Sequence, residues 1–184
     1  MAHKENQRIA LTRRLLQEGM LRLLAHDKLE NISVTALCKE SGINRATFYN
    51  HYTSPSQLLK EMETQLVDEL LRLSPPAKTI EEILDHTEKC CALLKENADL
   101  FQVLVRYHTD QNLENMIINT AQHYDSHRFD AANIKMDPAS MILVPAYLYA
   151  GCYALIREWL IRDIDKTPRE IAQLLVDIVN KDYL

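Results

Sequence analysis

The sequence predicts an all-α fold, and three observations support this prediction. Of the 184 residues, 47% are hydrophobic, which is enough to bury a core. The chain holds only three glycines and six prolines, so it has little material for the tight turns that connect β-strands. Apolar residues recur at the three- and four-residue spacing of helices along most of the chain. We therefore expect about nine helices.

The N-terminal segment predicts a long helix followed by a short one. Apolar residues repeat at helical spacing from Ile9 to Leu24, with arginines among them. Ser33 then precedes "VTALCKES" as an N-cap, and Gly42 follows as the residue that ends the helix. This second helix is about two turns long.

A third helix begins directly after the glycine. Asn44 is placed to cap "RATFYNHY", in which Phe48 and Tyr52 lie one turn apart. Two short helices joined by a glycine-containing turn form a helix-turn-helix, whose second helix fits the roughly 12 Å wide major groove of DNA.

The outward side chains of this third helix have the chemistry of a groove-facing surface. Arginine binds guanine or phosphate, asparagine pairs with adenine, threonine contacts a base or the thymine methyl group, and tyrosine and histidine reach phosphate oxygens. The alternative is a solvated amphipathic helix, but a solvated face seldom concentrates aromatic among basic groups. The five side chains expected to point outward are Arg45, Thr47, Tyr49, Asn50 and His51.

The rest of the chain predicts one connecting helix and a helical bundle. Ser54 and Pro55 are an N-cap and a first helical residue, and an apolar stripe continues to Leu73, before two prolines. We expect a DNA-binding domain over residues 1–54 and a regulatory and dimerisation domain over residues 55–184, with 55–73 as the connecting helix. Further helices are predicted over residues 79–96, 98–107, 113–129, 138–161 and 168–179.

Charge and composition narrow the classes of function. Residues 1–55 hold eight Lys/Arg against five Asp/Glu, whereas residues 56–184 hold thirteen against twenty-one, so a nucleic-acid surface is expected only at the N-terminal end. No basic-apolar leader opens the sequence and the four cysteines form no CxxC pair, which favours a cytoplasmic protein. The longest apolar run, 141–156, is shorter than the roughly 20 residues of a membrane span, so we expect no membrane contact.

The segment "ISVTALCKESGINRATFYNHY", followed by "SQLL", resembles the DNA-binding domain of the TetR/AcrR transcriptional regulators over residues 8–71. The resemblance implies a regulator, commonly a repressor, that binds operator DNA. One position departs from the family pattern, since Pro55 replaces a lysine that would contact phosphate. The DNA-binding residues that the resemblance implies are Ser33, Thr35, Asn44, Arg45, Thr47, Tyr49, Asn50 and His51.

The C-terminal end is similar to that of one subgroup of this family, in which the last two helices form a homodimer. "GCYALIREWL", a short loop and "TPREIAQLL" carry this similarity. Independently, the helix over 138–161 is apolar on all sides, so one face needs a partner. The predicted dimer interface comprises Tyr153, Ile156, Trp159, Leu160, Ile171, Leu174, Leu175 and Ile178.

The resemblance also implies an effector that binds between the fourth and seventh helices and moves the fourth. The effector is an unknown small molecule or protein; the alternative to a small-molecule sensor is a DNA-binding adaptor or co-activator controlled by a protein partner. The candidate pocket residues could equally be plain core, because Met and aromatic residues at helical spacing commonly are. They are Cys90, Phe101, Met116, His123, Tyr124 and Tyr147.

Metal, cofactor and enzyme chemistry are not expected. His123 and His127 have the four-residue spacing of a shared metal, as do His86 and Cys90, but no third ligand accompanies either pair. We therefore expect surface or pocket-lining histidines rather than a metal site. The sequence shows no Ser-His-Asp set and no glycine-rich phosphate loop, so neither an enzyme nor a cofactor is predicted.

Overall fold

The computed structural model confirms the prediction of an all-α chain. In the part of the chain that it describes, the regular elements are α-helices and one short 3-10 helix, without a strand. Among these residues no helix is long and apolar enough to cross a membrane. The described residues are 2–75, 77, 79–107, 113–115, 117, 118 and 137–181.

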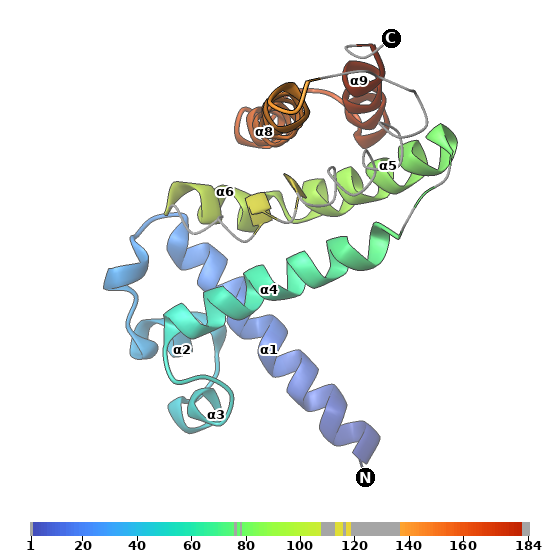
Figure 1. Ribbon diagram of the computed structural model, residues 1–184. Coiled ribbons are helices and arrows are strands. Elements are labelled where there is room, and N and C mark those ends of the chain that lie inside the picture. The colour runs from blue at the N-terminus through green and yellow to red at the C-terminus, as the bar shows by residue number, and fades with distance from the viewer. Residues whose placement is uncertain are drawn as a thin grey trace.

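The N-terminal helices form a compact unit at one end of the molecule (Figure 1). α4 crosses α1 and continues away from α2 and α3 toward the rest of the chain (Figure 1). The predicted start of α4 is confirmed, because the Ser54 side chain accepts a hydrogen bond from the Gln57 amide and Pro55 is the first helical residue. The elements are α1 (Ala2–Leu24), η1 (Leu29–Asn31), α2 (Val34–Ser41), α3 (Arg45–Tyr49) and α4 (Pro55–Leu73).

A glycine permits the close crossing of α1 and α2. A Cβ atom added to Gly19 would lie 3.0 Å from the Cβ atom of Ser41, closer than nine in ten Cβ contacts in proteins. Ser41 is buried, and its hydroxyl donates to the Leu37 carbonyl at 2.6 Å, so it needs no partner across the crossing. Arg22 of α1 adds an ion pair to Glu40 of α2, with an Nε–Oε1 distance of 2.6 Å.

The C-terminal helices form a bundle at the other end (Figure 1). α9 packs along α5, and α6 packs against α8. α5 begins one residue after the predicted Thr79, which caps it with Glu82. α8 begins two residues after the predicted Pro138, and the Asp137 carboxylate accepts from the amides of Ala139 and Ser140 in the turn that precedes it. The helices are α5 (Ile80–Glu96), α6 (Ala98–Arg106), α8 (Ser140–Ile161) and α9 (Pro168–Lys181).

A single hydrophobic core runs from the N-terminal unit to α9. In the bundle, Trp159 is only 1% exposed, and its Nε1 donates to the Lys166 carbonyl at 3.2 Å. The Lys95 ammonium lies 5.5 Å from the centroid of the Trp159 ring and 2.8 Å from Asp163 Oδ1. These contacts hold the end of α8 against α5.

The end of α6 reaches back to the N-terminal unit. The Arg106 guanidinium donates to the carbonyl of Leu24, the last residue of α1, at 3.4 Å. The Tyr107 hydroxyl donates to the Asp27 carbonyl at 2.6 Å. Because a helix leaves its last carbonyls without partners, the Arg106 contact satisfies a polar group at the end of α1, while Tyr107 bonds to the loop that follows. The bundle therefore contacts the N-terminal unit through α6 as well as through α4.

Candidate nucleic-acid interface

The turn between α2 and α3 is built by one glycine and two capping side chains. The Ser33 hydroxyl accepts from the Ala36 amide at 3.1 Å, and the Asn44 side chain accepts from the Thr47 amide at 2.7 Å, so both predicted caps are confirmed. Gly42 ends α2 in the left-handed region, with φ of 68°, which glycine adopts without strain. The turn thereby places α3 immediately after α2.

α3 has only five residues, and two aromatic side chains attach it to the core. Phe48 is fully buried and Tyr52 is 1% exposed, with 5.9 Å between their ring centroids. The Tyr52 amide donates to the Phe48 carbonyl at 2.9 Å, which extends the helical turn beyond Tyr49. Since these residues fill the inner face, the other side chains of α3 point outward.

None of the eight predicted DNA-binding residues is buried. Thr47 and His51 are half-buried and the other six, Ser33, Thr35, Asn44, Arg45, Tyr49 and Asn50, are exposed. The Arg45 guanidinium carbon lies 6.0 Å from the centroid of the Tyr49 ring, which in turn meets Phe48 edge-on at 5.5 Å. The predicted set therefore lies on the start of α2, at Ser33 and Thr35, and on α3 with the residues that flank it.

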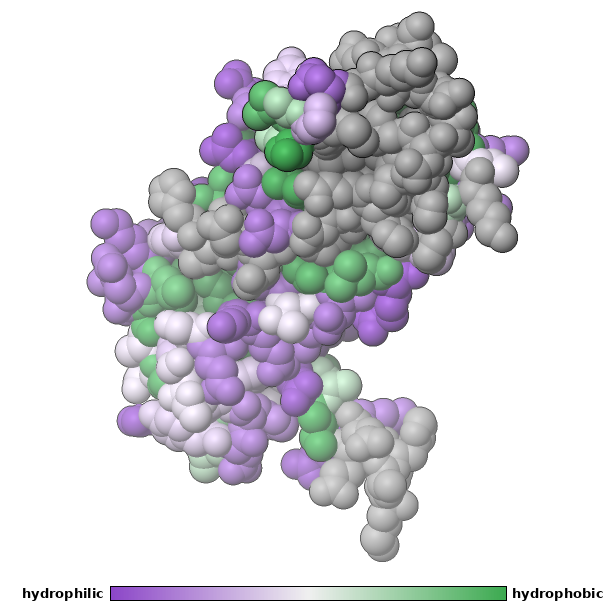
Figure 2. All heavy atoms as spheres, in the orientation of Figure 1, coloured by the Kyte–Doolittle hydropathy of each residue, from purple (hydrophilic) through white to green (hydrophobic). Residues whose placement is uncertain are grey.

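The charges of the N-terminal unit separate into paired and unpaired groups. Arg14 is paired with Glu18 at 2.8 Å and Arg22 with Glu40 at 2.6 Å. In contrast, five cations of these helices form no ion pair with a described residue, and these are Arg8, Lys39, Arg45, Lys60 and Arg72. Figure 2 shows that hydrophilic residues predominate at the end formed by α2 and α3. Unpaired cations on a polar surface suit phosphate binding.

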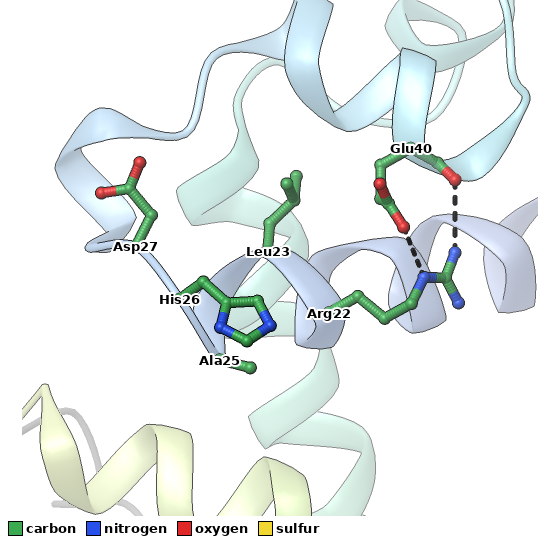
Figure 3. A pocket seen from close by; sticks show the side chains of 6 residues that line it. All are labelled: Arg22, Leu23, Ala25, His26, Asp27 and Glu40. Atoms are coloured by element: carbon green, nitrogen blue, oxygen red, sulfur yellow. Dashed lines mark hydrogen bonds and ion pairs between the residues drawn. The ribbon is translucent and has the colours of Figure 1, made fainter.

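An open depression lies behind this surface, where the end of α1 faces the end of α2. Figure 3 shows Arg22 reaching across it to Glu40, with the guanidinium donating to both the carboxylate and the main-chain carbonyl. It is lined by Arg22, Leu23, Ala25, His26, Asp27 and Glu40. The sequence analysis did not predict it, and its place differs from the predicted effector site in the bundle.

The described candidates for an effector pocket lie in three different environments. Phe101 is fully buried in the core, whereas Tyr147 is 76% exposed on α8. Cys90 is half-buried, with its Sγ 3.2 Å from the Ser74 hydroxyl at the end of α4. Burial raises the pKa of the Cys90 thiol, which stays protonated at neutral pH. The other three candidates, Met116, His123 and Tyr124, lie outside the described residues.

Of the two residue pairs with the spacing of metal ligands, the structure describes only one. His86 and Cys90 lie on α5, while His123 and His127 fall outside the described residues. Among the residues that the structure describes, no three His, Cys, Asp or Glu side chains gather in a way that could hold a metal ion.

Most of the predicted dimer residues are buried within their own chain. Six of them pack into the core at 1–7% exposure: Tyr153, Ile156, Trp159, Leu160, Ile171 and Leu175. A side chain that is already buried has almost no surface to offer to a partner. Leu174 is 40% exposed and Ile178 is half-buried, so these two retain surface. The large exposed apolar side chains of α8 are instead Ile142, Leu143 and Tyr147, at 67–76% exposure.

Sequence reasoning also missed two sets of contacts between the N-terminal unit and the helices beyond it. One is the pair of bonds from Arg106 and Tyr107 to the end of α1. The other joins Tyr52 to Glu61 of α4 at 3.1 Å. In the sequence, the Tyr52–Glu61 contact is indicated only by the expected inward packing of Tyr52. A buried tyrosine hydroxyl usually has a hydrogen-bond partner.

Comparison with known proteins identifies a matching family and similar proteins. A family model described as "Transcriptional regulator C-terminal region", of the TetR type, matches residues 81–181. An uncharacterized HTH-type transcriptional regulator, YxbF of Bacillus subtilis (strain 168), is 33% identical over 94 residues, or 48% of this chain. The match spans only 24% of the length of that relative.

Two solved structures show the same fold over nearly the whole chain. A TetR-family transcriptional regulator from Syntrophomonas wolfei has a TM-score of 0.69 and 16% identity, with 94% of each chain covered. The dihydroxyacetone kinase operon activator DhaS has a TM-score of 0.64 and 17% identity, with 94% of this chain and 96% of that chain covered. At these identities the similarity concerns the fold alone.

Proposed function

The chain belongs to the TetR family of transcriptional regulators, and we propose that it acts in the cytoplasm as a homodimer that binds operator DNA through α3 and represses transcription. The observation that carries this proposal is the surface of α3, where polar and basic side chains stand outward on a helix attached to the core by Phe48 and Tyr52. Arg45 would contact a guanine or a phosphate, and Asn50 an adenine. Tyr49 and His51 would bind phosphate oxygens.

Because Pro55 stands where the family has a lysine, the start of α4 carries no positive side chain that could bind phosphate. Pro55 is buried, and the Ser54 hydroxyl is occupied by the Gln57 amide at 3.2 Å. Lys39 and Arg45, which have no ion-pair partner among the described residues, would therefore supply much of the attraction to phosphate.

We place the boundary between the DNA-binding domain and the regulatory domain after residue 54. The proposed regulation acts through contacts between these two domains. α4 contacts α1 at one end, and α5 and α6 further along. An effector that displaced α4 or α6 would change how the two recognition helices of a dimer are spaced. Arg106 and Tyr107, which bond to the end of α1, support this route.

The proposed dimer surface is the exposed face of α8. Leu143, Tyr147, Ala150, Ala154 and Ile161 are all exposed. Their spacing of four, three, four and seven residues places them on one stripe, as in a coiled-coil seam, with the charged Arg157 and Glu158 between Ala154 and Ile161. The two alanines let a second helix approach closely, and Leu174 of α9 is also exposed at 40%. An apolar stripe of this length needs a partner, and a second copy of the chain offers the same stripe.

The second candidate function is an activator or adaptor controlled by a protein partner. The observation that favours it is the similarity in fold to a protein named as an operon activator. An in vitro transcription assay, with a promoter that carries the bound sequence, distinguishes a repressor from an activator. A repressor lowers transcript yield when the protein is added, and an activator raises it.

Selection from a randomised duplex library tests the proposal. The purified protein should enrich a sequence with two related half-sites, because a symmetric dimer presents two copies of α3. The selected duplex should then bind more tightly than a scrambled duplex at the same salt concentration. A library that remains random after repeated selection contradicts the proposal.

A further inference from the structure

Three elements meet at one carboxylate oxygen, Oε1 of Glu61 on α4. It accepts a hydrogen bond from the Tyr52 hydroxyl at 3.1 Å and another from the Gln65 side chain at 3.0 Å. The Arg13 guanidinium of α1 lies 3.4 Å from the same oxygen. Gln65 extends the network to α1, since its carbonyl oxygen accepts from Gln17 at 3.0 Å. The network lies where α4 passes α1 (Figure 1).

Tyr52 links this network to the recognition helix. Its ring is buried against Phe48, and its amide donates to the Phe48 carbonyl, so its position follows the end of α3. Burial and the adjacent Glu61 carboxylate raise the pKa of Tyr52 to about 12. The hydroxyl therefore stays protonated at neutral pH and donates to Glu61.

A directional bond matters here because α3 is short. Five residues make fewer than two turns, and a helix of that length has little stability of its own. Its orientation depends on Phe48 and Tyr52, and apolar packing alone is less directional than a hydrogen bond in a buried site. The Tyr52–Glu61 bond restricts the angle at which α3 stands relative to α4.

We propose that Glu61 is a positioning residue for DNA recognition. Through the Tyr52 hydroxyl it sets the orientation of α3 relative to α4, and thereby the preference for operator over other DNA. Glu61 does not touch DNA in this scheme, and its side chain is held among Tyr52, Gln65 and Arg13. The inference rests on the proposed function, in which α3 reads the operator.

Three substitutions dissect the network. Tyr52→Phe removes only the hydroxyl, Glu61→Leu removes the acceptor, and Glu61→Gln keeps an acceptor oxygen while it removes the charge that faces Arg13. The probes are the duplex selected by the wild-type protein and a scrambled duplex of the same length, both measured by fluorescence anisotropy. Thr64→Ala is the matched control, because among the described residues the Thr64 hydroxyl bonds only to the Lys60 carbonyl within α4.

We expect Tyr52→Phe to weaken binding to the selected duplex by ~3- to 10-fold and Glu61→Leu by ~10-fold or more, from the usual strength of such bonds. Glu61→Gln should retain part of the affinity. Binding to the scrambled duplex should change less than about 2-fold, because every side chain that reaches phosphate is still present and its charge attracts DNA of any sequence. Thr64→Ala should match the wild type on both duplexes.

A double variant separates positioning from general destabilisation. Tyr52→Phe combined with Glu61→Leu should bind the selected duplex as Glu61→Leu alone does, because the two changes break one bond. Circular dichroism confirms that each variant is folded at the assay temperature. If Glu61→Leu does not fold, Tyr52→Phe still decides, since it removes one oxygen atom and leaves Glu61 with two of its partners.

Two results would overturn the inference. One is that folded Tyr52→Phe and Glu61→Leu bind the selected duplex as tightly as the wild type. The other is an equal loss on the selected and scrambled duplexes, which would indicate reduced stability rather than altered orientation. A wild-type protein that does not distinguish the two duplexes contradicts the proposed function as well, and that result is visible before any variant is made.

Discussion

At the scale of single residues, the side chains in and next to α3 fall into two groups, one that packs in the core and one that is exposed. Phe48 and Tyr52 provide the packing, so Arg45, Tyr49 and Asn50 are left with exposed side chains. Arg45 differs from Arg14 and Arg22 in having no carboxylate partner among the described residues. A cation already paired with a carboxylate must lose that partner before it binds phosphate, whereas Arg45 loses only solvent. This makes Arg45 the arginine best placed to bind DNA.

We therefore predict that Arg45→Ala weakens binding to the selected duplex by roughly 10- to 100-fold, the usual cost of one specific arginine contact. Arg72→Ala is the control, because Arg72 is an equally exposed arginine at the far end of α4. The measurement is a titration at fixed salt, with circular dichroism to verify the fold. Arg45→Ala binding like Arg72→Ala would remove α3 from the DNA interface.

At the scale of elements, the crossing of α1 and α2 depends on the missing side chain of Gly19. Gly19→Ala places a methyl group 3.0 Å from the Ser41 Cβ atom, and the two helices must move apart. We predict a loss of roughly 1–3 kcal/mol in the free energy of unfolding, as for other overpacked sites. Chemical denaturation measures it. Ser41→Gly in the same chain removes the opposing atom, so the double variant should lose less than the sum of the two single losses.

The N-terminus of α9 carries a pH-dependent cap. The Glu170 carboxylate accepts from the amide and the hydroxyl of Thr167, both at 2.9 Å, and from Lys166 at 3.2 Å. The Thr167 amide is the largest cause, and together these contacts lower the pKa of Glu170 from 4.5 to about 2. A lowered pKa means that the folded state favours the carboxylate. Its contribution to stability is complete above pH 4.5 and disappears as the pH falls toward 2.

We predict that Glu170→Gln lowers the melting temperature at neutral pH, and that the difference from wild type shrinks as the pH falls from 4.5 to 2. Thermal melts across that range measure it. Asp165→Asn is the control, because Asp165 is an exposed carboxylate of the same loop that has no hydrogen bond with a described residue. A difference that stays constant with pH would show that the charge of Glu170 is not responsible.

Local signals predicted where several of the helices begin, and this has a physical reason. Caps such as Ser33, Asn44 and Thr79 act within three residues of themselves, so their effect is visible in a short stretch of sequence. Burial depends on which element covers an apolar stripe, and that cannot be seen locally. For this reason the sequence alone does not show that Ile171 and Leu175, which are expected at a dimer interface, are also buried in the core of their own chain.

At the scale of the whole molecule, the bundle reaches the DNA-binding unit by two routes. One is α4, which carries Glu61 at the network and contacts α5 further along. The other is the end of α6, where Arg106 and Tyr107 bond to the end of α1 and the loop after it. Movement of either helix would shift α1 and α4 relative to each other. Because the Glu61 network between them sets the orientation of α3, such a shift would change how the proposed dimer presents α3 to DNA.

Whether two such units act together depends on the exposed stripe of α8. Leu143 and Tyr147 are 67% and 76% exposed, and both stand on the seam with Ala150 and Ala154. Charges at these two positions would have to be buried without partners in a dimer, at a cost of several kcal/mol. We predict that Leu143→Glu combined with Tyr147→Glu yields a monomer in the micromolar range, measured by analytical ultracentrifugation, while the wild type is a dimer.

The matched control is Ile80→Glu, which places the same charge at a 54% exposed apolar residue away from this seam, at the start of α5. It should remain dimeric. The monomeric variant should also bind the selected duplex at least ~10-fold more weakly than the control does, because the second α3 no longer binds as part of the same complex. A double variant that stays dimeric would show that the face of α8 is not the interface. A monomer that keeps full affinity would show that one copy of α3 is sufficient for operator recognition.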